Sequence, residues 1–143
     1  MCNFSGEYEE LHYTGIPHRG FSLMSEKAPY ILVDDHPLLR EGMISALDEK
    51  NGFYCVGEAR TVSEMKELLC NKRPLIALVD ISLPDGSGFE IFPFLKTLKQ
   101  ERETPEAKVV FISMFIKPAY VARAVSLGAY GYISKETPPT VAR

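Results

Sequence analysis

The segment that decides the fold is PLIALVDISLP, residues 74–84. Its apolar side chains form a continuous run instead of an alternating one, which is typical of a strand buried on both faces of a parallel sheet. Asp80 comes directly after this run. In open parallel α/β sheets ligands bind beyond the carboxyl ends of the strands, so we expect the Asp80 carboxylate to face a site and not the core. A single aspartate at a strand end is also a common loop cap, so the other strands must decide between the two interpretations.

Composition and charge limit the classes of function open to this chain. It has 143 residues, of which 45% are hydrophobic and 24% charged, as expected for one domain with its own core. No apolar run approaches the roughly 18 residues of a membrane span, and the N-terminus lacks the pattern of a secretory signal. We therefore expect a cytoplasmic protein without membrane contact. The net charge of -3 argues against these residues forming a nucleic-acid clamp themselves.

The first 28 residues differ from the rest of the chain. They show no sustained periodicity, and glycines and a proline interrupt their apolar residues. We predict that residues 1–28 form a poorly ordered N-terminal extension. The patterned part of the chain, residues 29–143, is predicted to be a single domain.

Within that domain, β-rich apolar segments alternate with segments of helical periodicity. The predicted strands cover residues 30–33, 53–56, 75–79, 109–112 and 130–133, and the predicted helices cover 37–50, 62–69, 89–99 and 118–127. This alternation predicts an α/β fold, a five-stranded parallel sheet with helices on both faces. A fifth helix is expected to begin near Pro138 or Pro139, and it is truncated at Arg143.

Polar side chains follow four of the five predicted strands. They are Asp34, Asp35, Asp80, Ser113 and Lys135. Because the carboxyl ends of parallel strands meet at one edge of a sheet, we expect these groups to gather there. Three neighbouring carboxylates repel one another unless a cation neutralises them. Mg²⁺, which prefers oxygen ligands, is the expected cation.

At these positions the chain resembles the receiver domain of two-component response regulators, over roughly residues 29–140. The matching motifs are the paired acids (31–35), the phosphoacceptor strand and its Leu-Pro loop (77–84), the hydroxyl strand (111–113) and the Gly-Ala to Lys ending (128–135). The DDHP and GAYGYISKE segments are similar to receivers of the NarL/LuxR type. The resemblance implies a flavodoxin-like (CheY-like) fold with strand order 2-1-3-4-5, and a signalling domain instead of an enzyme.

The resemblance also implies a role for each polar residue. Asp80 is the phosphoacceptor, which takes a phosphoryl group from a sensor histidine kinase with the help of Mg²⁺. Asp35, Asp80 and the backbone carbonyl of Ser82 bind the metal directly, and Asp34 acts through a metal-bound water. Lys135 and Ser113 contact the phosphoryl group.

The same resemblance implies that the signal is passed on by a change in the surface of the domain. Ser113 moves toward the phosphoryl group and Tyr132 fills the space it leaves. The face formed by the fourth helix, the fifth strand and the fifth helix then changes shape. That face is expected to control a DNA-binding output domain beyond Arg143, and only this output domain is expected to contact DNA. The same face is expected to support a homodimer formed on phosphorylation.

Two alternatives from other classes stay open. An Mg²⁺-dependent phosphohydrolase with an aspartyl nucleophile normally carries a second Asp two residues later, where this chain has Ser82. A receiver-like interaction module that does not use phosphate is the other. Of the three histidines only His36 lies near the site, and it is interpreted as a loop residue and not as a ligand. Met114 stands where relatives often have a small residue, which predicts slow loss of phosphate.

Overall fold

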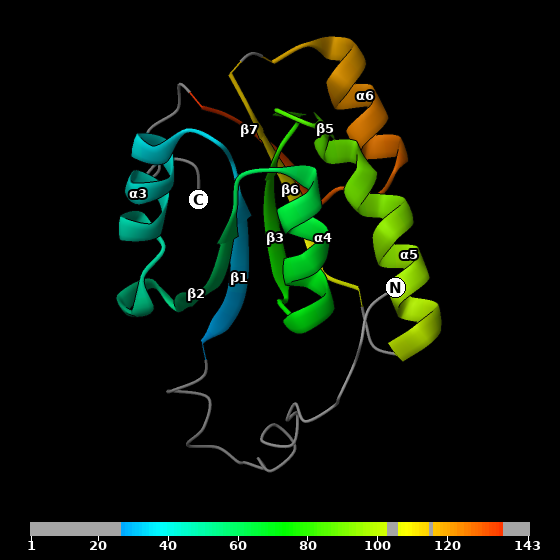
Figure 1. Ribbon diagram of the computed structural model, residues 1–143. Helices are drawn as coiled ribbons and strands as arrows, with labels where there is room; N and C mark the ends of the chain where they lie inside the picture. The colour runs from blue at the N-terminus through cyan, green and yellow to red at the C-terminus, as the bar shows by residue number, and fades with distance from the viewer. Residues whose placement is uncertain (1–26, 103–105, 115, 136–143) are drawn as a thin grey trace.

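The computed structural model describes residues 27–102, 106–114 and 116–135. Within them, five strands form one parallel sheet in the order β2-β1-β3-β6-β7 (Figure 1). The strands are β1 (Ala28–Val33), β2 (Phe53–Ala59), β3 (Ile76–Asp80), β6 (Lys108–Ser113) and β7 (Gly131–Ser134). Counted along the chain this is the order 2-1-3-4-5, which confirms the predicted topology.

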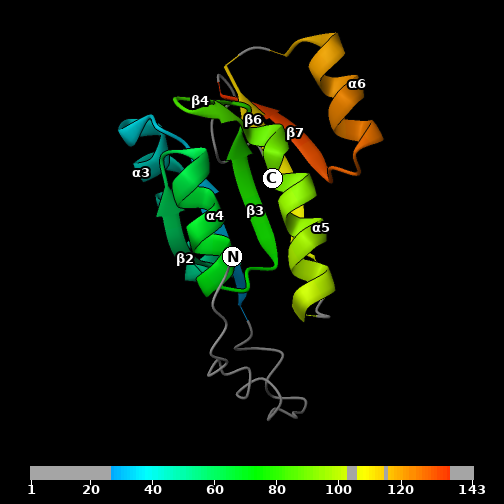
Figure 2. The ribbon, with the colours of Figure 1, turned by 45° about the vertical axis from the view of Figure 1, so that its right-hand side comes forward.

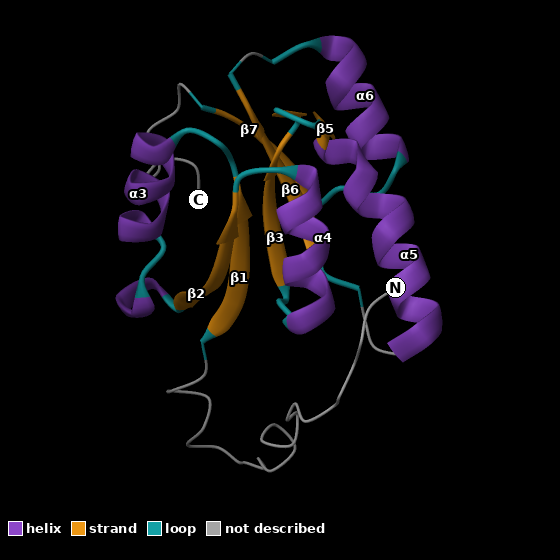
Figure 3. Ribbon diagram, viewed as in Figure 1, coloured by secondary structure: helices purple, strands orange, loops and turns teal. Residues whose placement is uncertain are grey.

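Helices cover both faces of the sheet, as predicted (Figure 2). They are α3 (Pro37–Ala46), α4 (Val62–Asn71), α5 (Ile91–Arg102) and α6 (Pro118–Ser126) in the described part of the chain. Helices α4 and α5 lie side by side on one face, and α3 lies on the other (Figures 1 and 2). Figure 3 shows the alternation of strand and helix along the chain. None of these helices is long and apolar enough to cross a membrane.

The packing of the central strands explains why their apolar residues form continuous runs and do not alternate with polar ones. On β1, Ile31 and Val33 belong to the core cluster that contains the buried residues of α4 and α5. Tyr30 and Leu32, which point to the opposite face, pack in a second cluster with Met43 of α3. Since successive side chains of a strand face opposite ways and both faces are covered, every position of the strand must be apolar.

The start of α4 is capped both locally and from a distant loop. Thr61 caps the helix, because its Oγ1 accepts a hydrogen bond from the Glu64 amide at 3.0 Å. The Glu64 carboxylate, however, accepts from the amide of Arg60 at 2.8 Å, so this pair does not form a capping box. The Asp85 carboxylate instead accepts the amides of Val62 at 2.7 Å and Ser63 at 3.1 Å. A residue from a distant loop thus supplies part of the cap.

Short elements lie between the long ones. Residues 85–88 belong partly to a small antiparallel hairpin of β4 (Ser82–Leu83) and β5 (Gly86–Ser87). The 3₁₀ helix η2 (Gly88–Glu90) then leads into α5. Helix α3 ends at Ala46, earlier than predicted, and η1 (Glu49–Asn51) follows it. Residues 1–26 and the expected final helix lie outside the described residues.

Candidate functional site

The polar residues predicted from the strand ends meet at one edge of the sheet. Asp34 follows β1, Asp80 ends β3, Ser113 ends β6 and Lys135 follows β7. Strand register aligns these ends, because Val33 pairs with Val79 and Asp80 pairs with Ile112. Asp34 and Asp80 are 0% and 2% exposed, and Ser113 is also buried. The parallel topology therefore brings together groups that lie far apart in the sequence.

Lys135 supplies positive charge to the buried carboxylates. Its Nζ donates to Asp80 Oδ2 at 2.7 Å and lies 3.2 Å from Asp34 Oδ2. The Lys135 side chain is only 4% exposed, so these ion pairs are shielded from water. Its backbone amide donates to the Ser113 carbonyl at 2.6 Å, which fixes the residue at the end of β7 against β6.

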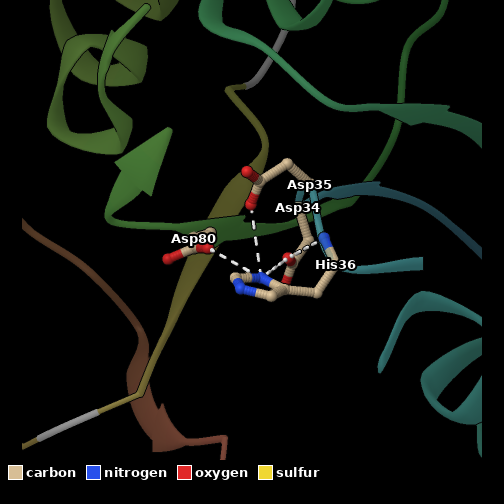
Figure 4. Close-up of side chains that lie close together, drawn as sticks. All are labelled: Asp34, Asp35, His36 and Asp80. Carbon is tan, nitrogen blue, oxygen red and sulfur yellow. Dashed lines mark hydrogen bonds and ion pairs between the residues drawn. The ribbon is translucent and has the colours of Figure 1, made fainter. Parts of the chain in front are cut away.

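His36, which the sequence placed near the site as a loop residue, lies with its ring among the carboxylates. Figure 4 shows its ring between Asp34, Asp35 and Asp80. Nδ1 is 2.8 Å from Asp34 Oδ1, 3.2 Å from Asp35 Oδ1 and 3.9 Å from Asp80 Oδ2. The signal in the sequence was its position directly after the acid pair, which does not reveal which way the ring turns.

The carboxylates of this cluster are not fully satisfied. Asp34 Oδ2 and Asp35 Oδ1 are buried and make no hydrogen bond. One ligand atom each from Asp34, Asp35, His36 and Asp80 can be chosen so that all four lie within 4.8 Å of one another. Carboxylate oxygens gathered this closely concentrate negative charge and fit a bound divalent cation. The residues present therefore suit the metal site that the sequence predicted.

Burial also affects the charge state of Asp80. Removal from water raises the pKa of its carboxyl, and the charge of Asp34 adds to this effect. The hydrogen bond and the positive charge of Lys135 oppose the rise, and so does the amide of Ser82, which donates to Asp80 Oδ1 at 3.1 Å. Desolvation is the largest contribution, so the pKa stays above its usual range.

Gly88 closes the loop beneath Asp80 and was not identified from the sequence as part of the site. A Cβ atom there would lie 2.2 Å from the Asp80 carbonyl oxygen and 2.8 Å from Val79 Cγ1. The Gly88 amide donates to the Ile81 carbonyl at 2.8 Å, which holds the hairpin against the end of β3. The absence of a side chain is thus a steric requirement of the close approach.

The two predicted switch residues occupy neighbouring strands. Tyr132 on β7 pairs in register with Phe111 on β6, and Ser113 ends that same strand. Tyr132 is half-buried and packs against the core cluster shared with α4 and α5. Met114 follows Ser113 and is 43% exposed. The positions suit the predicted switch, and the switch itself stays a prediction.

Comparison with known proteins gives consistent matches. The family model "Response regulator receiver domain" matches residues 30–141. The chain is 33% identical over 115 residues to "Probable transcriptional regulatory protein NarL" of Mycobacterium tuberculosis, covering 80% of this chain and 51% of that protein. It is 30% identical over 105 residues to "DNA-binding transcriptional activator DevR/DosR" of the same species, covering 73% and 46%. The chain thus spans about half the length of these relatives.

Solved structures show the same architecture. The signal receiver domain of the M. tuberculosis NarL protein superposes with a TM-score of 0.66 at 32% identity, covering 82% of this chain and 93% of that one. A CheY-like receiver domain protein from Methanospirillum hungatei has a TM-score of 0.60 at 24% identity, with coverage of 80% and 86%. The second likeness supports the CheY-like fold alone.

Proposed function

The chain belongs to the response regulator receiver domain family, and on that premise we propose that Asp80 accepts a phosphoryl group from a sensor histidine kinase. Receivers of this family are signalling domains and not enzymes. The observation that carries the proposal is the buried Asp80 carboxylate at the end of the central strand, 2.7 Å from the ammonium of Lys135. A carboxylate with a neighbouring fixed cation is equipped to take up a group that brings negative charge.

In the proposed reaction Asp80 is the nucleophile. A carboxylate oxygen forms a bond to phosphorus while the bond from phosphorus to the donor's leaving group breaks in line. Lys135 pairs with a phosphoryl oxygen as negative charge accumulates, and the hydroxyl of Ser113 donates to another. The Ser82 amide, which already donates to Asp80 Oδ1, orients the carboxylate.

We expect Mg²⁺ to be held directly by Asp35, Asp80 and the backbone carbonyl of Ser82, and by Asp34 through a metal-bound water. When bound, the ion neutralises the negative charge that the carboxylates and the phosphoryl group bring together. The support is the pair of buried carboxylate oxygens on Asp34 and Asp35 that make no hydrogen bond. An ion with oxygen preference would satisfy both.

The proposed output is control of transcription. Relatives such as the NarL protein are named as transcriptional regulators, and the match covers only 51% of that protein. We therefore place the domain in the cytoplasm, where it controls a DNA-binding output domain through Ser113, Tyr132 and the face of α6 and β7. Homodimer formation on phosphorylation belongs to the same proposal. DNA would be contacted through the output domain alone.

Intact mass spectrometry after incubation with acetyl phosphate tests the phosphoacceptor role. We expect a gain of one phosphoryl group that requires Mg²⁺, is lost in Asp80→Asn and is kept in Asp85→Asn. Asp85 is the matched control because it lies in the same loop but caps α4 instead of facing the acid cluster. Absence of a mass gain in every condition would contradict the proposal and favour a module that does not use phosphate.

A further inference from the structure

We propose that Arg40 is a positioning residue of the acid pair: its guanidinium fixes the peptide between Asp34 and Asp35 and so sets how tightly the site binds Mg²⁺. The inference rests on the metal site of the proposed function and goes beyond it, because Arg40 lies outside the predicted set of site residues. Arg40 acts through the backbone of the acid pair, and Glu58 orients Arg40 in turn.

The fold brings the Arg40 side chain back to the end of β1. Helix α3 starts shortly after the acid pair, and the Arg40 amide donates to the His36 carbonyl at 3.0 Å, which places Arg40 in the first turn. Long side chains on a helix lean toward its N-terminus. The Arg40 side chain therefore follows the surface of the domain toward β1, and it is only 16% exposed.

The guanidinium binds the backbone of the acid pair. Arg40 Nη1 donates to the carbonyl oxygen of Asp34 at 2.7 Å, and hydrogen bonds from a charged donor are the stronger kind. That carbonyl belongs to the planar peptide unit that joins Asp34 to Asp35. Holding the plane restricts the backbone torsion on each side of it. Those torsions set the directions in which both carboxylates project.

The other hydrogen bonds of the turn hold Asp34 and leave Asp35 to its backbone. The Asp34 amide donates to the Ala59 carbonyl at 2.9 Å, and Asp34 Oδ1 accepts the His36 amide at 2.8 Å. Asp35 is the more exposed acid, with 35% of its side chain accessible, and its Oδ1 makes no hydrogen bond. The direction of Asp35, a predicted direct ligand, thus depends on the peptide that Arg40 holds.

Glu58 on β2 orients the guanidinium from its other side. Its Oε1 accepts a hydrogen bond from Arg40 Nε at 3.1 Å. A cation near the N-terminus of a helix interacts unfavourably with the helix dipole, and the Glu58 carboxylate offsets this effect. Glu58 is 48% exposed, so its pairing with Arg40 is weakened by water. The contacts form a chain from Glu58 through Arg40 to the acid pair.

Loss of Arg40 should affect Mg²⁺ affinity more than the chemical step. Residues that orient metal ligands without binding the metal typically change its affinity 10- to 100-fold when they are mutated. Asp80 is held separately, by the Ser82 amide and the Lys135 ammonium. Phosphorylation at saturating Mg²⁺ should therefore stay near the wild-type rate, while more Mg²⁺ is needed to reach it.

Isothermal titration calorimetry with MgCl₂ on the full chain tests the proposal, alongside the Mg²⁺ dependence of modification by acetyl phosphate. We expect Arg40→Met to raise the Kd for Mg²⁺ by at least about tenfold. Arg40→Lys keeps the charge and one donor and should recover part of the affinity. Arg102→Met is the matched control, because Arg102 also donates to backbone carbonyls, those of Cys70 and Lys72 at the C-terminal end of α4. It should bind Mg²⁺ normally.

A double variant tests whether Glu58 acts through Arg40. Glu58→Ala should raise the Kd less than Arg40→Met does, and adding it to Arg40→Met should cause no further loss. In the metal-free chain, amide hydrogen exchange at residues 34–36 should be faster in Arg40→Met than in the wild type, which a role confined to the bound metal would not produce.

Unchanged Mg²⁺ affinity in Arg40→Met, or an equal loss in Arg102→Met, would overturn the proposal and leave the phosphoacceptor role intact. A wild type that binds no Mg²⁺ would overturn the predicted metal site and this inference together. Calorimetry does not require phosphorylation, so the reverse case is distinguishable: Arg40-dependent Mg²⁺ binding in a chain that acetyl phosphate cannot modify would remove the phosphoacceptor role and support this inference.

Discussion

At the scale of single residues, the ammonium of Lys135 and the carboxylates of Asp34 and Asp80 depend on one another. The three side chains are almost completely buried, and the ammonium lies about as close to each carboxylate as an ion pair allows. Burial of charge is tolerated only when opposite charges are paired. Removing one member should therefore affect stability as well as phosphorylation.

We predict that Lys135→Met lowers the free energy of unfolding by about 3 kcal/mol in the absence of divalent cations, because it removes the ammonium that two buried carboxylates share. Urea denaturation monitored by circular dichroism measures this loss. Added Mg²⁺ should recover part of it. Lys135→Arg, which keeps the charge, serves as the control, and equal stability of Lys135→Met and the wild type would contradict the prediction.

The raised pKa of Asp80 gives a prediction for pH. The unfolded chain releases this proton at lower pH than the folded chain, so the wild type loses stability as pH rises from the ordinary aspartate pKa through the raised one. Asp80→Asn lacks this penalty. We expect it to have the higher urea midpoint at neutral pH, with the difference disappearing in acid; a constant difference across pH would show that burial is not the cause.

The sequence predicted which residues gather at the site, but not how each side chain is turned. Asp34, Asp80 and Lys135 were predictable because strand ends of a parallel sheet share one edge. The ring of His36 was missed, since its direction depends on contacts with residues that are distant in sequence. Gly88 was missed because its close approach to the Asp80 carbonyl exists only after the hairpin has folded onto β3.

At the scale of elements, the β4–β5 hairpin follows β3 and contacts the N-terminus of α4. Asp85, at its tip, accepts the first amides of that helix, and these hydrogen bonds hold its pKa below the usual range. A carboxylate at a helix N-terminus also interacts favourably with the helix dipole. The loop that carries Ser82 is thus anchored at its far end.

Asp85→Ala should therefore lower the urea midpoint at neutral pH. A carboxylate with a depressed pKa stabilises the folded state at pH values above its pKa in the unfolded chain. This stabilisation is lost as pH falls through its pKa in the folded chain. The difference between variant and wild type should shrink in acid, the opposite trend to that of Asp80→Asn. Asp85→Asn keeps an acceptor oxygen and should lie between the two; a difference unaffected by acid would argue against the cap.

Gly88→Ala tests the contact between the hairpin and β3. Its methyl group would overlap the Asp80 carbonyl, so we expect a loss of about 2 kcal/mol, within the range for overpacking. Gly42→Ala in α3 is the matched control. Nothing lies within 4 Å of its Cβ position, and the helix should gain up to about 1 kcal/mol. Equal effects at both positions would show that the steric argument is wrong.

The long elements were predictable and the short ones were not. Long strands and helices can be predicted because their apolar residues recur with the period of the element. The two-residue strands β4 and β5 have no period, and they exist because Asp85 and Gly88 hold the loop in place. Likewise, the cap of α4 draws on Asp85, more than twenty residues away, which local capping rules cannot anticipate.

At the scale of the whole molecule, one sheet edge carries the site while α6 and β7 carry the proposed output surface. Val125, Leu127 and Tyr130 of this region are exposed apolar residues. If phosphorylation changes this surface, hydrogen exchange in α6 and β7 should differ between phosphorylated and unphosphorylated chains. Ser113→Ala should be phosphorylated on Asp80 yet show a smaller change, and an identical response in this variant would contradict the role of Ser113.

The contact between Asp34 and Lys135 joins residues 101 positions apart, which follow the first and the last strand of the described sheet in chain order. This ion pair helps to hold the edge strand β7 in place, because β7 pairs only with β6 within the described sheet. A force applied to the C-terminal side of β7 would have to break this ion pair before β7 could separate from β6. In single-molecule pulling from that side, the first rupture should need less force in Lys135→Met, and an unfolding protease that begins there should be slowed by whatever strengthens this ion pair.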